Sequence, residues 1–488
     1  MTKVRSIRTD SGVAMVTVLL VGMVLTVVTS MAAFSTIQEI KAGTSDRKAA
    51  EALSYAEAGI DRFLRYVRVE NVTWHKLIVA GCEDAEGLTV PKGVLGDGQF
   101  EATLKVYEPN PPSGNQADKI VPGACNYRAT VPNDPEGQHF IITSKGSETG
   151  ANRVVQQIVK VTPLGLPIGI YAQAIDAGGT PDMTGISMFT EGQIVGREKI
   201  QFEGIDPYYT MADFFPDGVS GRSMTEHVPA GAHAISGIFL KQNGTRPEFP
   251  GPTAPTTRNC TANGTVNGVV GQSLWDSDGS TATGTVTAGC TGQTGYPLSS
   301  KFTPTIMDKI RPHQLTEQDH QALRDAARTS GIYCSIGTTT SCTRMGQPMS
   351  GMPAAWQDGD IAPLFAAGNN NFVAYFDFLT GATLSNKISW KAEVWGCNAT
   401  NPDLNRSAVI VTRRGGLDIQ SNARVNGAFL MDGELGYSGT PTLNGPIISQ
   451  AGFRISGTAN FSLDDCWVRN MPGPFLTTAP TTWAEVDR

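Results

Sequence analysis

The sequence predicts one long N-terminal helix, then a small α+β domain, then a large β-rich region. Three observations lead to this prediction. A charge-free apolar run extends from Ser11 to Gln38 and passes directly into a helical pattern. Several later segments alternate apolar and polar residues, as strands with one buried face do. From about residue 168 a short glycine-containing unit recurs in a background rich in glycine and proline.

The first half of the helix is long enough to cross a membrane. A bilayer core is about 30 Å thick and a helix rises about 1.5 Å per residue, so about 20 apolar residues suffice. The apolar run provides this length, and we expect a helix over residues 13–64 that spans a membrane to about residue 37. A short basic leader, residues 1–12, precedes it and ends at Gly12.

The second half of the helix is amphipathic, because apolar residues recur every three or four positions with charged residues between them. Such a stripe needs an adjoining domain on which to be buried. The stripe comprises Ala49, Leu53, Ala56, Ile60 and either Phe63 or Leu64.

This arrangement resembles the N-terminal region of type IV pilins, and specifically that of the PilX-type minor pilins. The resemblance covers about the first 65 residues and implies cleavage by a prepilin peptidase between Gly12 and Val13. It also implies an inner-membrane protein that later joins a pilus at the cell surface. Its partners would be other pilins and minor pilins, the peptidase and the inner-membrane assembly platform. The matching residues are Gly12, the run Val13–Phe34, Asp46, Arg47, Ala49, Glu57, Ala58, Gly59 and Ile60.

One position departs from the pilin pattern. Most pilins have glutamate at the fifth mature residue, thought to pair with a neighbouring subunit's terminal ammonium, whereas this chain has Thr17. A buried ammonium is costly without a counter-charge. Thr17 therefore favours a minor subunit at the filament tip or at initiation over a repeating major subunit.

A secretory signal and a plain membrane anchor are the alternatives for this N-terminal segment. Ala32 and Ala33 after Ser30 could form the cleavage site of a secretory signal. A plain anchor would need only the apolar run. Neither alternative accounts for helical periodicity that continues past the membrane.

The domain after the helix is expected over residues 65–167. Four segments alternate apolar and polar residues and are separated by polar turns, which predicts an antiparallel sheet that receives the helix's apolar stripe. This corresponds to the α+β domain that the pilin resemblance implies. The segments are 98–108, 125–131, 138–145 and 152–162.

Residues 168–488 are expected to form a β-rich head. An apolar residue, Asn or Ser, then Gly recurs, and Gly427 and Gly445 lie 18 residues apart. Glycine tolerates positive φ at sharp corners, so 168–250 and 405–468 are interpreted as coils of one β-solenoid. An irregular β-sandwich is the alternative. The copies begin at Thr184, Ile235, Val425, Leu443 and Ile455.

An insertion is expected between these two blocks, over about 250–345. It contains one clear helix, for which Thr316 is the N-cap, Asp319 completes a capping box and Gly331 marks the end. Leu315 and Leu323 give the helix an apolar side that could cover a flank of the head.

The cysteine content predicts disulfides. The number is even, no pair has C-x-x-C spacing, and an exported chain favours four bridges. The pairing is not fixed by sequence, but Cys260–Cys290 and Cys334–Cys342 enclose short polar segments, and Cys82–Cys125 would leave Cys397 with Cys466. The cysteines are Cys82, Cys125, Cys260, Cys290, Cys334, Cys342, Cys397 and Cys466.

The search for catalytic chemistry finds little. There is no nucleophile elbow, phosphate loop or HExxH pair, and we expect no catalytic residue, metal or cofactor. Asp276 and Asp278 lack the register of a calcium loop. Asp432 and Glu434 share a face, but a polar corner explains them equally well. Asp464 and Asp465 are adjacent and would point to opposite faces of a strand. The histidines are expected at surfaces or turns: His75, His139, His227, His233, His313 and His320.

Composition favours a non-catalytic exported protein. Only 17% of the 488 residues are charged, Gly and Pro number 54 and 29, and the net charge is −7. This charge argues against a broad nucleic-acid-binding face, although Arg413 and Arg414 could form a local basic patch. The sequence therefore predicts a minor pilin or pilus assembly protein. The alternatives are a receptor pilin for DNA uptake or surface adhesion, and a membrane-anchored carbohydrate-active enzyme with paired carboxylates.

Overall fold

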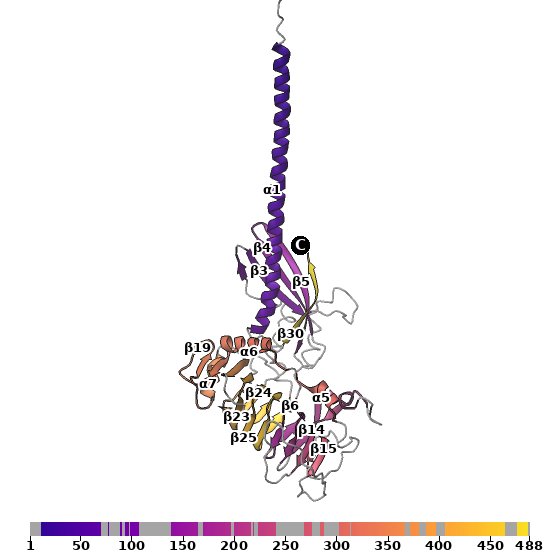
Figure 1. Cartoon of the computed structure of the whole chain (residues 1–488), viewed down its shortest axis with the longest axis vertical. Coiled ribbons are helices and arrows are strands. Elements are labelled where there is room, and N and C mark those ends of the chain that lie inside the picture. Colours follow the sequence, from indigo (N-terminus) through magenta and orange to yellow (C-terminus); the bar gives the residue numbers. More distant parts are fainter. Residues whose placement is uncertain are drawn as a thin grey trace, which may run out of the picture.

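The computed structural model places one long helix, a small sheet and a large β-rich body along one axis (Figure 1). The C-terminal end of the described chain lies beside the small sheet. The structure describes residues 11–69, 77, 88–89, 93–96, 98–106, 138–163, 169–196, 200–215, 218, 223–240, 268–275, 284–286, 302–312, 314–366, 371–379, 387–396, 406–463 and 476–486.

Helix α1 (Ser11–Val69) has two halves with opposite environments. From Thr17 to Arg47 every residue is exposed, including the large apolar side chains. From Ala52 onward one stripe is buried against β3, β4 and β5 of the small sheet. The buried positions are Ala52, Ala56, Gly59, Ile60, Phe63 and Val67, whereas Ala49, Leu53 and Leu64 are half-buried at the margin of the stripe.

The small sheet, here called the first sheet, is antiparallel with the strand order β1-β3-β4-β5-β30, and β2 also pairs with β3. Its inner face contributes Leu104, Phe140, Ile142 and Val159 to a core shared with α1. The predicted strand 125–131 lies outside the described residues. The strands are β1 (Leu88–Thr89), β2 (Gly93–Leu95), β3 (Gly98–Val106), β4 (Gln138–Glu148), β5 (Ala151–Pro163) and β30 (Leu476–Glu485).

Strand β30 corrects the predicted domain boundary. The sequence pattern assigns all of 168–488 to the head, but β30 pairs along its length with β5, from Leu476 opposite Pro163 to Glu485 opposite Val155. The chain therefore leaves the first sheet after β5, builds the body, and returns as an edge strand. A non-local pairing of this kind leaves no local sequence signal, because β30 (LTTAPTTWAE) is Thr-rich and contains Pro480.

The β-rich body, residues 169–463, is built on three parallel ladders. Its inner strands differ from those of the first sheet, because their neighbours run in the same direction. The first ladder is β17 (Ile332–Ile336), β20 (Asn371–Phe378), β22 (Ser407–Arg413), β24 (Arg424–Met431), β27 (Ile447–Ser449), β6 (Ile170–Ala172), β9 (Met188–Thr190) and β14 (Gly231–Leu240). The second is β21 (Lys387–Trp390), β23 (Gly416–Ser421), β25 (Leu435–Gly439), β28 (Phe453–Gly457), β7 (Ile175–Ala177), β10 (Ile194–Gly196) and β14. The third is β24, β26 (Thr442–Asn444), β29 (Asn460–Ser462), β8 (Asp182–Thr184) and β11 (Ile200–Glu203).

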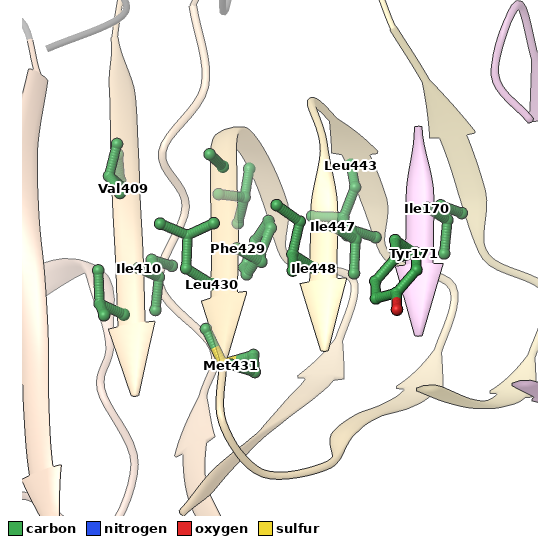
Figure 2. Close-up of a cluster of buried hydrophobic side chains, with 14 of the residues drawn as sticks. Ile170, Tyr171, Val409, Ile410, Phe429, Leu430, Met431, Leu443, Ile447 and Ile448 are labelled. Atoms are coloured by element: carbon green, nitrogen blue, oxygen red, sulfur yellow. The ribbon is translucent and has the colours of Figure 1, made fainter. Parts of the chain in front are cut away.

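The register of these ladders repeats at the spacing that the sequence predicts. Phe429 lies opposite Ile447, Leu435 opposite Phe453 and Thr442 opposite Asn460, each pair 18 residues apart. One apolar residue of each strand points into the body's interior, so the stacked strands bury a continuous core. Figure 2 shows part of it, where Ile410, Phe429, Ile447 and Ile170 lie on neighbouring strands.

The order of strands in each ladder is not the order of the chain. The chain enters in the middle, at β6, and builds β9 and β14 toward one end. It then reappears at the opposite end with β17 and returns through β20, β22 and β24. The last strands, β27, β28 and β29, pair with the first, β6, β7 and β8. This closing set of pairs is called the seam.

Glycine corners explain part of the recurring unit and correct another part. Gly427 and Gly445 occupy the same corner, with φ of 144° and 145°. A Cβ on Gly445 would lie 1.9 Å from the carbonyl oxygen of Gly427, so only glycine fits this stack. Gly457 instead lies at another corner, opposite Gly439. Gly237 lies within β14, between the residues that pair with β9 and those that pair with β10. The Asn/Ser-Gly unit therefore marks corners, but not one common corner.

Antiparallel strands and helices cover the ends and flanks of the body. Near β14, the elements are β12 (Ile205–Thr210), α4 (Met211–Phe214), β13 (His227–Pro229), β15 (Gly268–Trp275), β16 (Gly284–Val286) and α5 (Pro304–Ile310). Near β17, they are β18 (Ser341–Arg344), β19 (Gln347–Pro348), α6 (Glu317–Ser330) and α7 (Asp358–Ala366).

The predicted helix is confirmed in α6, with Thr316 and Asp319 forming the capping box. It packs on β17 and β20 and also contacts α1. The predicted insertion 250–345 is too long, because β17 belongs to the first ladder.

Candidate functional site

The exposed half of α1 is the most distinctive surface of the described chain. A span within Thr17–Val67 has the length and composition of a membrane-crossing helix, and none of that apolar window is buried in the protein. Leu19, Met23, Met31 and Phe34 are each more than half exposed. Water disfavours so large an apolar surface, so this half is built for contact with lipid or with other apolar helices.

The expected processing residues lie at the start of this half. Gly12 and Val13 belong to the first turn of α1, and Thr17 is exposed one turn later. These positions fit a helix that begins at the end of the leader. The cleavage itself and the role of Thr17 stay predictions.

The remaining motif residues divide between the surface and the seat of α1 on the first sheet. Arg47 donates through Nε to Glu51 Oε1 at 2.9 Å, one helical turn away, and Asp46 and Glu57 are exposed. Gly59 is buried where α1 crosses β4: a Cβ there would lie 2.1 Å from the Ser144 hydroxyl.

Strand β4 mirrors this close approach. A Cβ on Gly146 would lie 2.0 Å from the carbonyl oxygen of Ala52, and Lys48 Nζ donates to the Thr149 carbonyl at 2.9 Å. Glycines on both partners thus allow the helix and the strand to touch. The sequence identifies Gly59 through its motif, whereas Gly146 lies in an ordinary strand pattern and is missed.

Arg413 and Arg414 do not form an open basic patch. Arg413 donates both terminal nitrogens to Glu317 of α6, at 3.1 and 2.8 Å. Arg414 Nη2 and Arg324 Nε donate to the two oxygens of Asp377, at 2.6 and 3.2 Å. Asp377 is 7% exposed. These contacts fasten α6 to β20 and β22, and the arginines' charge is largely neutralised there.

A cavity of about 200 Å³ lies next to this network, between the 314–320 segment and the first ladder. His320 and Asp432 line it, together with Leu430 and Ile448. His320 Nδ1 and the Tyr375 hydroxyl share a hydrogen bond of 2.9 Å, and burial lowers the pKa of His320. Asp432 accepts from the Arg414 backbone N–H at 2.9 Å. The polar groups are therefore engaged with the protein itself.

Glu434 lies in a second polar cluster, on the outer side of the second ladder. It pairs with Lys387 and, at 3.4 Å, with Arg454, whose Nε lies 4.0 Å from Asp176. Asp432 and Glu434 thus have different cationic neighbours, as expected of a polar corner. Asp464, Asp465, Asp276 and Asp278 lie outside the described residues.

Two titratable residues are fully buried at the β14 end, which corrects the expectation that the histidines lie at surfaces or turns. His233 stacks among Phe189, Phe214 and Phe302, and burial lowers its pKa to about 3. Burial raises the pKa of Asp206 to about 7, although Ser187 and the Tyr208 backbone donate to it. His320 is also buried, whereas His227 is exposed; His75 and His313 lie outside the described residues.

The disulfide Cys334–Cys342 is present and joins directly opposite residues of β17 and β18. Both cysteines are buried. The other six lie outside the described residues, so their pairing stays a prediction. Within the described residues, no group of three or more His, Cys, Asp or Glu side chains could hold a metal ion.

Comparison with known proteins yields one distant likeness. No protein-family model matches the chain, and no curated protein matches it. Among solved structures, the competence-associated pilin ComZ from Thermus thermophilus is 14% identical, with 90% of this chain and 98% of that chain covered. The TM-score is 0.20, which is too low to establish a shared fold.

Proposed function

We propose that this chain is a non-catalytic minor pilin or pilus assembly protein of a type IV filament system, of the PilX type. The observation that carries the proposal is the division of α1. Its first half exposes apolar side chains continuously, and its second half is seated on an antiparallel sheet. A helix of this kind can be held in the inner membrane first and among the helices of other pilins later.

The attachment of the body supports a display role. The body is connected between β5 and β30, two neighbouring strands of one sheet, so both of its links to the stalk lie close together. Figure 1 shows the body at the opposite end of the molecule from the exposed half of α1. A protein anchored by that half would hold the body away from the membrane, at the pilus or cell surface.

The proposal includes a β-solenoid architecture for the body. Its support is the parallel pairing in three ladders, the 18-residue register and the glycine corners. A sandwich built of antiparallel strands would not have these pairings. The solenoid provides a rigid head without depending on a bound cofactor.

The proposed partners are other pilins, the prepilin peptidase and the inner-membrane assembly platform. The proposal treats the head as non-catalytic because Asp432 and Glu434 are engaged with the protein's own cationic or backbone groups. Paired carboxylates facing an open cleft would favour the carbohydrate-active alternative. DNA uptake and adhesion are the alternative roles for a displayed head.

N-terminal processing tests the proposal. The full chain co-expressed with its prepilin peptidase should begin at Val13, and Gly12→Asp should block the cut, as read by mass spectrometry of the intact protein. Gly22→Asp is not a suitable control because it would place a charge in the membrane, so Gly43→Asp, on the exposed polar side of the span, serves instead. An N-terminus near Ala33 would overturn the pilin assignment.

A further inference from the structure

The third ladder presents a regular array of small polar side chains on its outer face. On β26, β29 and β8, the middle residues Leu443, Phe461 and Met183 are buried in the interior. Because side chains alternate along a strand, the residues on either side of them point outward. The outward residues are Thr442 and Asn444, then Asn460 and Ser462, then Asp182 and Thr184.

The corner before these strands adds a further row. Thr440, Thr458 and Thr180 each follow a glycine, in the segments GTPTLN, GTANFS and GTPDMT. The hydroxyls of Thr180 and Thr458 lie 3.2 Å apart, and Thr440 donates to the side-chain oxygen of Asn422. We call this surface, from Asn422 and Arg424 to Thr180–Thr184, the hydroxyl face.

The side chains of the hydroxyl face are held in place before any ligand arrives. Their strands are fixed by parallel pairing, Pro441 and Pro181 restrict the corner, and hydroxyls of successive coils bond to each other. Each threonine hydroxyl has one donor and two acceptor sites, so a single bond to a neighbour leaves capacity for another partner. Preorganised groups lose less conformational entropy on binding.

The spacing suits a linear repeating partner. Neighbouring strands lie about 4.8 Å apart, so similar hydrogen-bonding groups recur at that interval along the stack. Thr440, Thr458, Asn460 and Thr184 are exposed, and Thr442, Ser462 and Thr180 are half-buried. The surface therefore offers short, shallow contacts in rows rather than a pocket for a small molecule.

Charge selects the class of partner. Arg424 stands at one end of the face, but it pairs with Glu393 at 2.6 Å and lies 5.5 Å from the centre of the Trp395 ring. Asp182 and Glu203 lie toward the other end. A face with two carboxylates and one paired guanidinium repels a polyanion such as DNA. A neutral polymer with many hydroxyls fits it, and Trp395 provides an apolar ring beside the polar rows.

We infer that the hydroxyl face binds a neutral polysaccharide laid along the stack of coils. The inference goes beyond the proposed function and rests on it only for display of the body outside the cell. N-terminal processing tests the display and a glycan assay tests the face, so either can fail without the other.

The test is affinity electrophoresis of the detergent-solubilised full chain in native gels containing hydroxyethylcellulose, laminarin or soluble xylan. At least one glucan or xylan gel should retard the wild-type chain. The double variant Thr442→Glu/Asn460→Glu should lose that retardation, with a rise in Kd of tenfold or more. The matched control Gln173→Glu/Ser456→Glu adds the same two charges at exposed positions away from the hydroxyl face and should bind as wild type does.

Thermal unfolding of each variant checks that the substitutions leave the body folded. A double variant that unfolds early is replaced by Thr442→Gln/Asn460→Gln, which keeps the face neutral but lengthens both side chains, and which should also weaken binding. The inference is overturned if none of the three polymers retards the wild-type chain, or if the control variant loses binding equally. It is also overturned if salt-sensitive binding to duplex DNA depends on the same residues.

Discussion

Gly445 illustrates how single residues determine the stacking of the body. Its missing side chain leaves room for the Gly427 carbonyl of the preceding coil, and its φ of 145° is unfavourable for residues with a Cβ. The sequence makes this corner visible because Asn-Gly recurs at coil spacing. Gly146 has the same importance at the α1 contact, but nothing in a strand pattern distinguishes a glycine that meets a helix from one that does not.

Replacing Gly445 by alanine should destabilise the protein by more than about 2 kcal/mol, because backbone strain and a backbone clash act together. The measurement is the urea midpoint of the solubilised full chain. Gly359→Ala is the matched control, since a Cβ there meets nothing within 4 Å and its φ is not positive. Equal midpoints for the two variants would contradict the close corner contact.

Asp206 and His233 are buried groups with opposite effects on the pH dependence of stability. The pKa of Asp206 rises from 3.8 to about 7 on folding, so its stabilising contribution falls as pH rises through that window. The pKa of His233 falls from 6.5 to about 3, so its contribution grows as pH rises from 3 to 6.5. Between about pH 4 and 6.5 the two contributions offset each other.

Asp206→Asn should remove this balance. The variant's free energy of unfolding should rise between pH 4 and pH 6.5 by on the order of 3 kcal/mol, because only His233 still titrates there. The wild-type curve should be nearly flat in this range and decline between about pH 6.5 and pH 7. Urea titrations at stepped pH measure both curves. A variant curve as flat as that of the wild type would contradict the assignment.

At the scale of elements, local patterns predict well and distant pairings do not. Helix α1, strands β3 to β5 and helix α6 follow from periodicity, alternation and a capping box, all of which are short-range signals. Strand β30 and the seam could not be predicted, because their partners lie hundreds of residues away in the chain. The ion pairs that hold α6 were missed for the same reason: Arg413 and Glu317 come together only after folding.

The β17–β18 hairpin carries the disulfide that the sequence predicts. We expect the remaining six cysteines to be oxidised as well, because the chain is exported and their number is even. Thiol titration of the mature chain under denaturing, non-reducing conditions should therefore find no free thiol. A Cys334→Ser/Cys342→Ser variant, which removes only the observed bridge, should also give none and should lose about 2–4 kcal/mol of stability. Two or more reactive thiols in the wild-type chain would refute four bridges.

At the scale of the whole molecule, the seam makes the body one cooperative unit. Because β27, β28 and β29 pair with β6, β7 and β8, both ends of the body's chain are fixed in its middle, and the same region connects to the first sheet. The α5–α6 segment crosses from the β14 end, where Arg311 pairs with Glu191, to the β20 end, where Arg324 pairs with Asp377. The head should therefore move with the stalk rather than as a loosely linked domain.

The size and attachment of the body bear on position in a filament. A head of nearly 300 described and connecting residues, 169–463, would crowd a helical array of closely packed subunits. Thr17 adds a second constraint, since it has no carboxylate to offer a neighbour's ammonium, and an unpaired buried ammonium costs several kcal/mol. Both constraints relax at a filament tip, where no subunit lies ahead and the head has room.

We therefore expect low copy number, with gold-labelled antibodies against the head marking filament ends or the cell envelope in electron micrographs. Thr17→Glu separates the two constraints, because it restores the counter-charge and leaves the head unchanged. If the head alone excludes the protein from the shaft, labelling of this variant stays at the ends. If Thr17 contributes, some label moves into the shaft. Regular labelling of the wild-type protein along the whole shaft would show that neither the head nor Thr17 restricts its position.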